Sequence, residues 1–91
     1  MTGSSGGRSG PGTDPAERPL DRLAPGDSGV IVRLTGDPAT ARRLMELGLV
    51  PGSEVQVVRR APLGDPIEYR IRDVHLSLRR VEAANVHVAP R

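Results

Sequence analysis

His75 and His87 are the two histidines of this 91-residue chain and its best candidates for binding a metal ion. Imidazole nitrogens are common ligands of transition metals, and the strand pattern places the Glu68 carboxylate within reach of His75. A protein metal site needs three or four converging ligands, whereas these two histidines fall on separate strands and point outward. We therefore expect solvent-facing histidines, no metal ligand and no cofactor.

The rest of the sequence forms no recognisable catalytic set. The chain has no cysteine, which excludes a thiolate nucleophile, a thiolate metal site and a disulfide framework. It has no nucleophile-elbow motif, no glycine-rich phosphate loop after a strand and no carboxylate pair with an evident partner. The loop APLGDP (61–66) contains a single glycine, which is too few to cradle a nucleotide. The sequence therefore predicts a protein that is not an enzyme.

Positive charge is carried by arginine alone, and the net charge is +2. The arginines include the pairs Arg42–Arg43, Arg59–Arg60 and Arg79–Arg80, whose members point in different directions on a strand or helix. So small a positive net charge would attract the phosphates of a nucleic acid only weakly, and we expect no nucleic-acid partner. Most of these side chains are expected to keep a small domain soluble. Arg59 and Arg79 are candidate anchors for a protein partner.

The candidate residues named above all belong to one small folded domain that follows an N-terminal tail. Residues 1–18 are mainly Gly, Ser, Pro, Thr and charged residues, so they cannot offset the entropy of ordering. We expect a disordered tail over residues 1–18 and a folded domain over residues 19–89. No segment approaches the roughly 20 apolar residues that span a bilayer, so we expect no membrane insertion and a cytoplasmic protein.

Five short strands are predicted, at residues 30–34, 54–60, 67–71, 74–78 and 86–88. In the first, Val30, Val32 and Leu34 share one face and Ile31 shares the other with an arginine. In the next three, alternation assigns these side chains to one face, which is the inward face: Val55, Val57, Ile67, Tyr69, Ile71, Val74, Leu76 and Leu78. The loop at 61–66 separates two of the strands. Gly64, Asp65 and Pro66 are structural turn residues within it.

One helix is predicted between the first two strands. Asp37 is a good N-cap, and Pro38 falls at the first helical position, where its missing N–H costs nothing. The helix then runs over residues 39–47, and a left-handed Gly48 ends it.

The sequence after this helix explains several neighbouring apolar residues. If Gly48 is left-handed, Leu49 packs back on Leu44, as in a Schellman ending. Pro51 and Gly52 form the centre of a type II turn. The fold class is therefore all-β: a small, partly open barrel of about five strands with one short inserted helix.

Three ordered motifs, LGLVPG, APLGDP and LSLRRVEA, lie within the segments RRLMELGLVPGSEVQVVRRAPLGDPIEYRI and LSLRRVEAANVHV. In this order and spacing they resemble the FeoA family of small cytosolic accessory proteins of bacterial ferrous iron transport. The resemblance extends over nearly all of residues 19–88. It implies an SH3-like barrel with an inserted helix. It also implies a regulatory contact with FeoB, a membrane transporter with a cytosolic GTPase domain.

Met45, Leu47 and Leu63 are apolar where turn geometry requires nothing apolar. At least one of Met45 and Leu47 should be partly exposed, since both cannot face inward comfortably. Exposed apolar groups reduce solubility unless something covers them. We therefore expect Met45, Leu47 and Leu63, with Arg59 and Arg79, to contribute to a docking face. The competing interpretation is that Met45 and Leu47 are simply core and that the loop containing Leu63 serves only as a turn.

A second function stays open at this point. Related SH3-like domains occur at the C-terminus of iron-dependent repressors of the diphtheria-toxin-repressor type, so the chain could be a free-standing relative of such a domain. That function needs a DNA-reading helix. Residues 80–85 allow only one helical turn, which favours the transporter partner.

Overall fold

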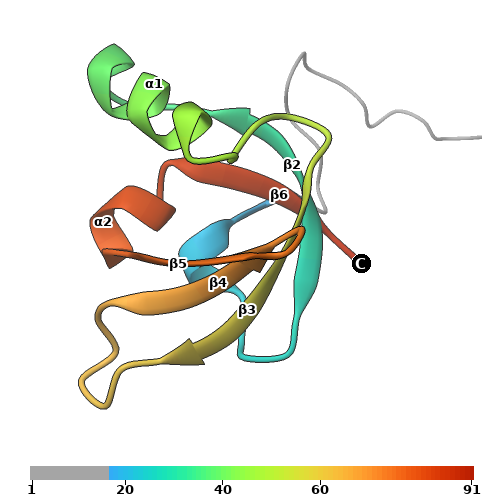
Figure 1. Cartoon of the computed structure of the whole chain (residues 1–91), viewed down its shortest axis with the longest axis vertical. Coiled ribbons are helices and arrows are strands. Elements are labelled where there is room, and N and C mark those ends of the chain that lie inside the picture. Colours follow the sequence, from blue (N-terminus) through green and yellow to red (C-terminus); the bar gives the residue numbers. More distant parts are fainter. Residues whose placement is uncertain (1–16) are drawn as a thin grey trace, which may run out of the picture.

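The computed structural model describes residues 17–91, which form one antiparallel sheet with two helices and a short 3-10 helix (Figure 1). The strands are β1 (Arg18–Pro19), β2 (Ser28–Leu34), β3 (Glu54–Arg60), β4 (Ile67–Ile71), β5 (Val74–Leu78) and β6 (Val86–Pro90). The 3-10 helix is η2 (Leu20–Arg22), and the helices are α1 (Pro38–Glu46) and α2 (Arg80–Ala83). The sheet order is β1-β6-β2-β3-β4-β5.

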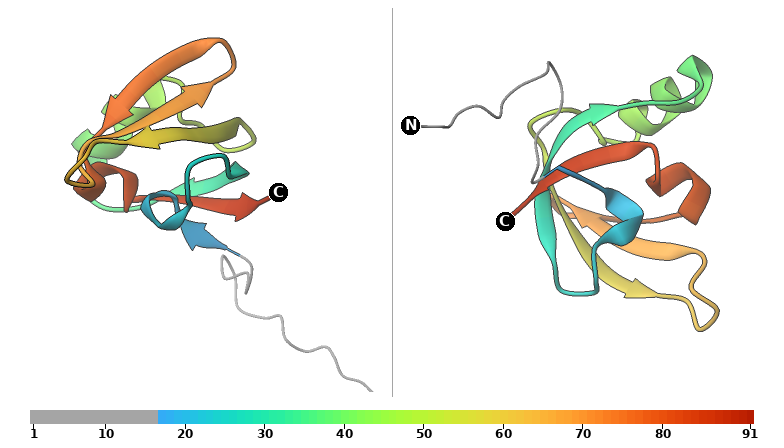
Figure 2. Two further views of the ribbon diagram at one scale, coloured as in Figure 1. Left: turned by 90° about the horizontal axis from the view of Figure 1, so that it is seen from below. Right: turned by 180° about the vertical axis from the view of Figure 1, so that it is seen from behind.

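The sheet is strongly curved, so that its two halves cover one core. Figure 2 shows β3, β4 and β5 on one side, with β1, β2 and β6 on the other. The core is aliphatic apart from one tyrosine and consists of Leu20, Leu23, Ile31, Leu44, Leu49, Val55, Val57, Ile67, Tyr69, Ile71, Leu78, Ala83, Val86 and Val88. The prediction of a mainly β fold with one short helix between the first two predicted strands is confirmed.

The start of the domain differs slightly from the expectation. β1 begins at Arg18 and β6 ends at Pro90, one residue outside the predicted domain at each end. The prediction of a tail falls mostly on residues 1–16, outside the described residues. Sequence reasoning missed β1 and η2, because two-residue strands and single 3-10 turns carry no periodicity.

The η2 segment is nevertheless part of the core. Leu20 and Leu23 are buried, and the Arg60 guanidinium donates to the carbonyl oxygens of Asp21 (2.6 Å) and Leu23 (2.9 Å). These bonds fasten the N-terminal segment to the end of β3. Arg60 therefore holds the N-terminal segment in place, and this segment closes one side of the barrel.

The predicted alternation of β2 is wrong beyond its middle. The register against β6 shifts between Ile31, which pairs with Val88, and Arg33, which pairs with His87. Ile31 is buried and Val32 is exposed, and the irregularity then turns Leu34 back toward the core. A bulge breaks the two-residue period, which is why the face shared by Val32 and Leu34 was wrongly predicted.

The β4–β5 hairpin confirms most of its predicted faces. Ile67, Tyr69 and Ile71 are buried, as is Leu78. Val74 is an exception: it was expected to point inward but is 56% exposed. It follows the turn on the outermost strand of the sheet, where no further strand covers it.

The turn of this hairpin contains the one described non-glycine residue with a positive φ, Arg72 at +58°. Such a conformation costs an L-residue about 1–2 kcal/mol, which glycine avoids at the expense of greater chain entropy. We expect Arg72→Gly to stabilise the domain by about 0.5–1 kcal/mol, raising Tm by several degrees. Thermal unfolding followed by circular dichroism measures this, and Asp73→Gly, without a positive φ to relieve, should lower Tm. A fall in Tm for Arg72→Gly would contradict the argument.

Candidate functional site

The C-terminal end of α1 is the first candidate surface, and its geometry follows from how the helix is capped. The Asp37 carboxylate accepts the Thr40 N–H (3.2 Å), and Pro38 occupies the first turn, as predicted. At the other end Gly48 has a φ of +108°, and the Leu49 N–H donates to the Leu44 carbonyl oxygen (3.1 Å). The predicted Schellman ending is therefore confirmed.

This ending separates buried from exposed apolar residues. Leu44 and Leu49 are fully buried, whereas Met45 is 43% and Leu47 45% exposed. The expectation that at least one of Met45 and Leu47 would be partly exposed is met by both. We call Met45 and Leu47 the α1 surface.

The turn after α1 joins this surface to the sheet. Gly52 has a φ of +94°, and the Ser53 N–H donates to the Val50 carbonyl oxygen (3.1 Å), as a turn centred on Pro51 and Gly52 requires. Gly52 N–H also donates to the carbonyl oxygen of Ile31 on β2 (2.8 Å). The turn is therefore pinned to the strand that precedes the helix.

The loop at 61–66 is compact and contacts α2. Gly64 has a φ of +87°, and its N–H donates to the Ala61 carbonyl oxygen (2.7 Å). The Asp65 carboxylate accepts the Arg80 N–H (3.0 Å) at the start of α2, and the following peptide bond to Pro66 is cis. Asp65 was predicted only as a turn residue; its contact with α2 is non-local and left no signal in the sequence.

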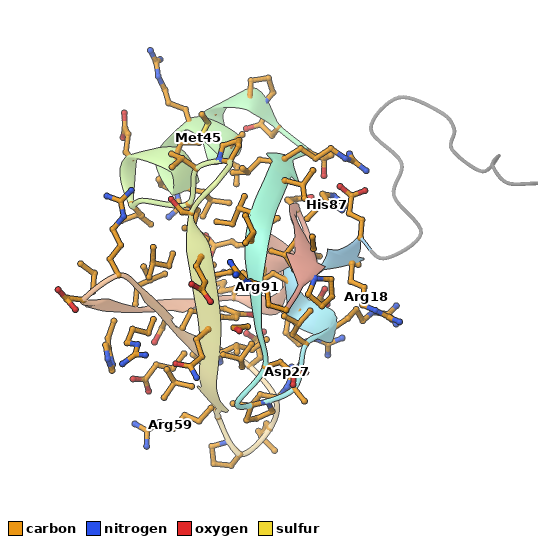
Figure 3. The ribbon with its side chains drawn as sticks, turned by 90° about the vertical axis from the view of Figure 1, so that its right-hand side faces the viewer. Arg18, Asp27, Met45, Arg59, His87 and Arg91 are labelled. Carbon is orange, nitrogen blue, oxygen red and sulfur yellow. The ribbon has the colours of Figure 1, made fainter. Side chains whose placement is uncertain are left out.

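The five predicted partner-binding residues do not lie on one face. Figure 3 places Met45 on α1 at one end of the molecule and Arg59 at the opposite end. Leu63, 95% exposed, is in the loop that follows Arg59 along the chain and lies at that same end. The single docking face assembled from the sequence is therefore two separate surfaces.

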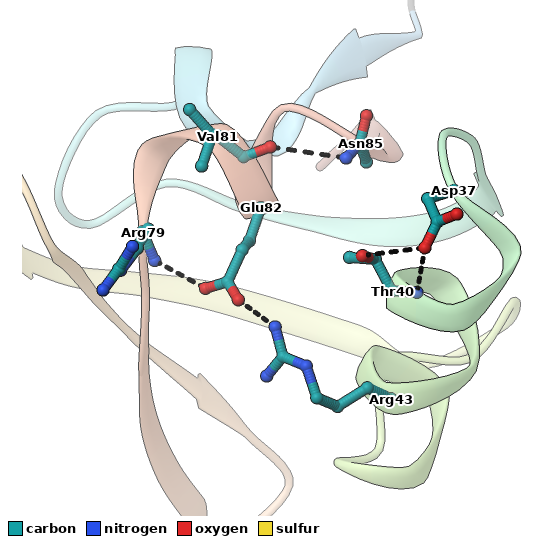
Figure 4. A network of polar contacts seen from close by, with 7 residues as sticks. All are labelled: Asp37, Thr40, Arg43, Arg79, Val81, Glu82 and Asn85. Atoms are coloured by element: carbon teal, nitrogen blue, oxygen red, sulfur yellow. Dashed lines mark hydrogen bonds and ion pairs between the residues drawn. The ribbon is translucent and has the colours of Figure 1, made fainter.

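Arg79, the N-cap of α2, takes part in a polar network that connects α1 with α2 (Figure 4). The Glu82 carboxylate accepts the Arg79 backbone N–H (2.9 Å) and forms an ion pair with Arg43 of α1. The Arg79 amide and then the Arg43 guanidinium hold the pKa of Glu82 below its ordinary value. Because the carboxylate is mostly covered, this network fixes the position of α1 relative to α2.

The two histidines have different surroundings. His75 is exposed, and its Nδ1 lies 3.3 Å from the Glu68 carboxylate, as the strand pattern indicated. The Arg59 guanidinium, 2.8 Å from the same carboxylate, is the main cause of a lowered pKa of Glu68, and His75 adds to it. The Glu68 carboxylate therefore already interacts with both Arg59 and His75.

His87 corrects the expectation of a solvent-facing histidine. It is half-buried on β6, and its Nε2 lies 3.0 Å from the Thr35 hydroxyl. Burial, and then the positive charge of Arg33, lower the pKa of His87. Arg33 itself pairs with Glu17 (3.1 Å), so the neighbouring carboxylate is also engaged.

These surroundings do not fit a metal ion. Among residues 17–91 no three histidine, cysteine, aspartate or glutamate side chains converge as ligands. The carboxylate nearest His75 is paired with Arg59, whose charge opposes a cation.

The same described part of the chain contains no helix long and apolar enough to cross a membrane.

Comparisons with known proteins identify the family of this domain. The family model described as FeoA domain matches residues 18–90. The chain is 46% identical over 69 residues to an Fe(2+) transport protein A/Fe(2+) transporter FeoB fusion protein of Porphyromonas gingivalis. That match covers 76% of this chain but 8% of the relative, so the chain spans only a small part of it.

Solved structures show the same fold. A FeoA of Stenotrophomonas maltophilia complexed with zinc, described as an SH3 domain protein, is 33% identical with a TM-score of 0.69, covering 79% of this chain and 93% of that one. A manganese-dependent transcriptional repressor complexed with manganese has a TM-score of 0.78 at 23% identity, covering 87% and 39% of the two chains. The second likeness concerns the fold alone.

The absence of converging ligands generates a binding prediction. Titration with Zn²⁺, used as a redox-inert probe, should reveal no stoichiometric site tighter than about micromolar by calorimetry, because fewer than three ligands converge. A tight one-to-one site that is lost in His75→Ala would contradict it.

His87 generates a prediction about pH. Since its pKa is lowered in the fold, the unfolded chain binds more protons, and stability rises with pH. The contribution is complete above the ordinary pKa of 6.5 and is lost as pH falls through the lowered value. We expect His87→Gln to reduce the fall in Tm between about pH 7.5 and pH 5. His75→Gln, on an exposed position, is the matched control; an unchanged pH dependence in His87→Gln would refute the argument.

Proposed function

The chain belongs to the FeoA domain family, and from this premise we propose that it is an accessory protein of ferrous iron uptake that regulates a FeoB-type transporter by direct contact. The fusion relative supports this function, because it joins the two named components in one polypeptide. A domain that is fused to a transporter works beside it. For this chain we place the contact on the cytosolic side of the membrane.

The observation that carries the proposal is the α1 surface. Met45 and Leu47, at the C-terminal end of α1, are large apolar side chains that are each nearly half exposed, whereas Leu44 of the same helix is fully buried. The helix is held firmly by the buried Leu44 and by the ion pair of Arg43 with Glu82. A rigid, partly apolar helix end is a suitable contact for a protein partner.

We place the transporter contact on the α1 surface rather than at Leu63 and Arg59. Arg59 and the loop that contains Leu63 lie at the opposite end of the domain, and Arg59 is engaged with Glu68. They therefore serve as a comparison surface, not as part of the same contact.

The second candidate, a free-standing relative of a repressor domain, has less support. The likeness to the manganese-dependent repressor is a likeness of fold. Reading DNA requires an element that enters a groove, and α2, the second α-helix within residues 17–91, spans only Arg80–Ala83.

The proposed contact makes a prediction about three neighbouring residues. Leu44→Asp should unfold the protein, because an unpaired buried charge costs several kcal/mol, comparable with the stability of a small domain. At least one of Met45→Asp and Leu47→Asp should stay folded and lose association with the FeoB-type transporter. Circular dichroism reports folding, and co-purification with the detergent-solubilised transporter reports the contact.

Leu63→Asp is the matched control, because it places the same charge on the opposite end of the molecule. It should fold and associate as the unaltered chain does. If both α1 variants fold and still associate while Leu63→Asp does not, the contact lies at the 61–66 loop. If no form of the chain associates, the proposed function itself is wrong.

A further inference from the structure

The two ends of the sheet are built differently. β1, at one end, has two residues, one of which is Pro19, and leads directly into η2. β5, at the other end, has five residues, Val74–Leu78, with neither proline nor arginine among them. It is paired with β4 on one side only. Natural sheets usually blunt exposed edges with short strands, proline or charge, and β5 has none of these devices.

The backbone groups on this edge follow from the hairpin. A two-residue turn joins Ile71 to Val74, so this pair is hydrogen-bonded. Alternation then directs the N–H and C=O groups of Leu76 and Leu78 toward β4, and those of His75 and Ser77 outward. His75 and Ser77 are both exposed. Two residues therefore present a free donor and acceptor pair each, which we call the open edge of β5.

The side chains beside the open edge are partly apolar. Val74, 56% exposed, and the partly buried Leu76 continue the apolar row that ends at the buried Leu78. A strand added here would extend that row over Val74. The β4 residue paired with Val74 approaches the turn after α1: a Cβ placed at Gly48 would lie 3.9 Å from the Ile71 side chain.

The charges beside the open edge favour an acidic occupant. Arg72 precedes β5, Arg79 follows it, and Arg70 lies opposite His75 on β4. Asp73 is the opposing charge in the turn. The other two carboxylates near this edge already have cationic partners: Glu68, opposite Ser77, pairs with Arg59, and Glu82, which accepts the Arg79 N–H, pairs with Arg43. An extended segment that carries acidic residues complements this distribution.

We propose that the open edge of β5 accepts an extended, acidic segment of the FeoB-type transporter as an added strand, next to the α1 surface. Main-chain hydrogen bonds to His75 and Ser77 would supply affinity, and Val74 would be covered by an apolar side chain of the segment. This inference rests on the proposed function for the identity of the partner.

Amide hydrogen exchange tests the inference directly. In the free protein the outward amides of His75 and Ser77 should exchange rapidly, whereas those of Leu76 and Leu78 are protected by β4. Adding the detergent-solubilised transporter should slow exchange at His75 and Ser77 by at least about tenfold, which mass spectrometry with single-amide fragmentation resolves. Protection confined to α1 would overturn the inference while sparing the proposed function.

Ser77→Pro is the matched variant, because it removes an outward N–H without removing a bond to β4. It should weaken association with the transporter by at least about tenfold, while Ser77→Ala binds normally. A folded Ser77→Pro that binds normally overturns the inference. If the variant does not fold, the exchange measurement on the unaltered chain decides alone.

Two further outcomes separate the possible occupants. Protection of His75 and Ser77 that depends on protein concentration without the transporter assigns the edge to a second copy of the chain, and overturns the inference. Failure of the unaltered chain to bind the transporter overturns the proposed function, and this partner with it.

Discussion

The structure depends on enclosing a small aliphatic core from every side. The chain has no Phe or Trp, and its one tyrosine, Tyr69, is fully buried. A domain of this size buries a modest fraction of its surface and has little stability to spare. The sheet alone does not cover the core, so η2, α1 and α2 each contribute buried side chains to it. Segments that look peripheral are therefore part of the stable unit.

Because several separate elements enclose the core, polar groups are needed where those elements meet. Arg60 bonds two carbonyls of the segment around η2, and Glu82 connects α2 to α1. The Tyr69 hydroxyl and one carboxylate oxygen of Asp21 are buried without a hydrogen-bond partner among the described residues. Burial raises the pKa of Tyr69, so its hydroxyl keeps its proton and remains a donor. The polar groups thus lie where separate elements meet over the core.

Local chemistry made much of the fold predictable. The Asp37 cap, the left-handed Gly48 and the turn at Gly52 each depend on residues adjacent in the chain, and all three are present. The non-local features were not predictable. The bulge at Val32 arises from the register of β2 against β6, and the α1–α2 ion pair joins residues 39 positions apart. For the same reason the sequence identified Met45, Leu47 and Leu63 as candidates for exposure, but neither the exposure of Val74 nor the fact that Met45 and Leu63 lie on different surfaces.

The ending of α1 connects stability with exposure. Gly48 turns the chain so that Leu49 enters the core beside Leu44, and the same turn leaves Met45 and Leu47 outside. It also brings the backbone of Gly48 near Ile71, at the tip of the hairpin that contains β5. A partner that covered the α1 surface would therefore lie near the turn end of the β4–β5 hairpin, where the backbone is already held by the buried Ile71. Neither surface needs to fold upon contact, so little conformational entropy of this chain would be lost there.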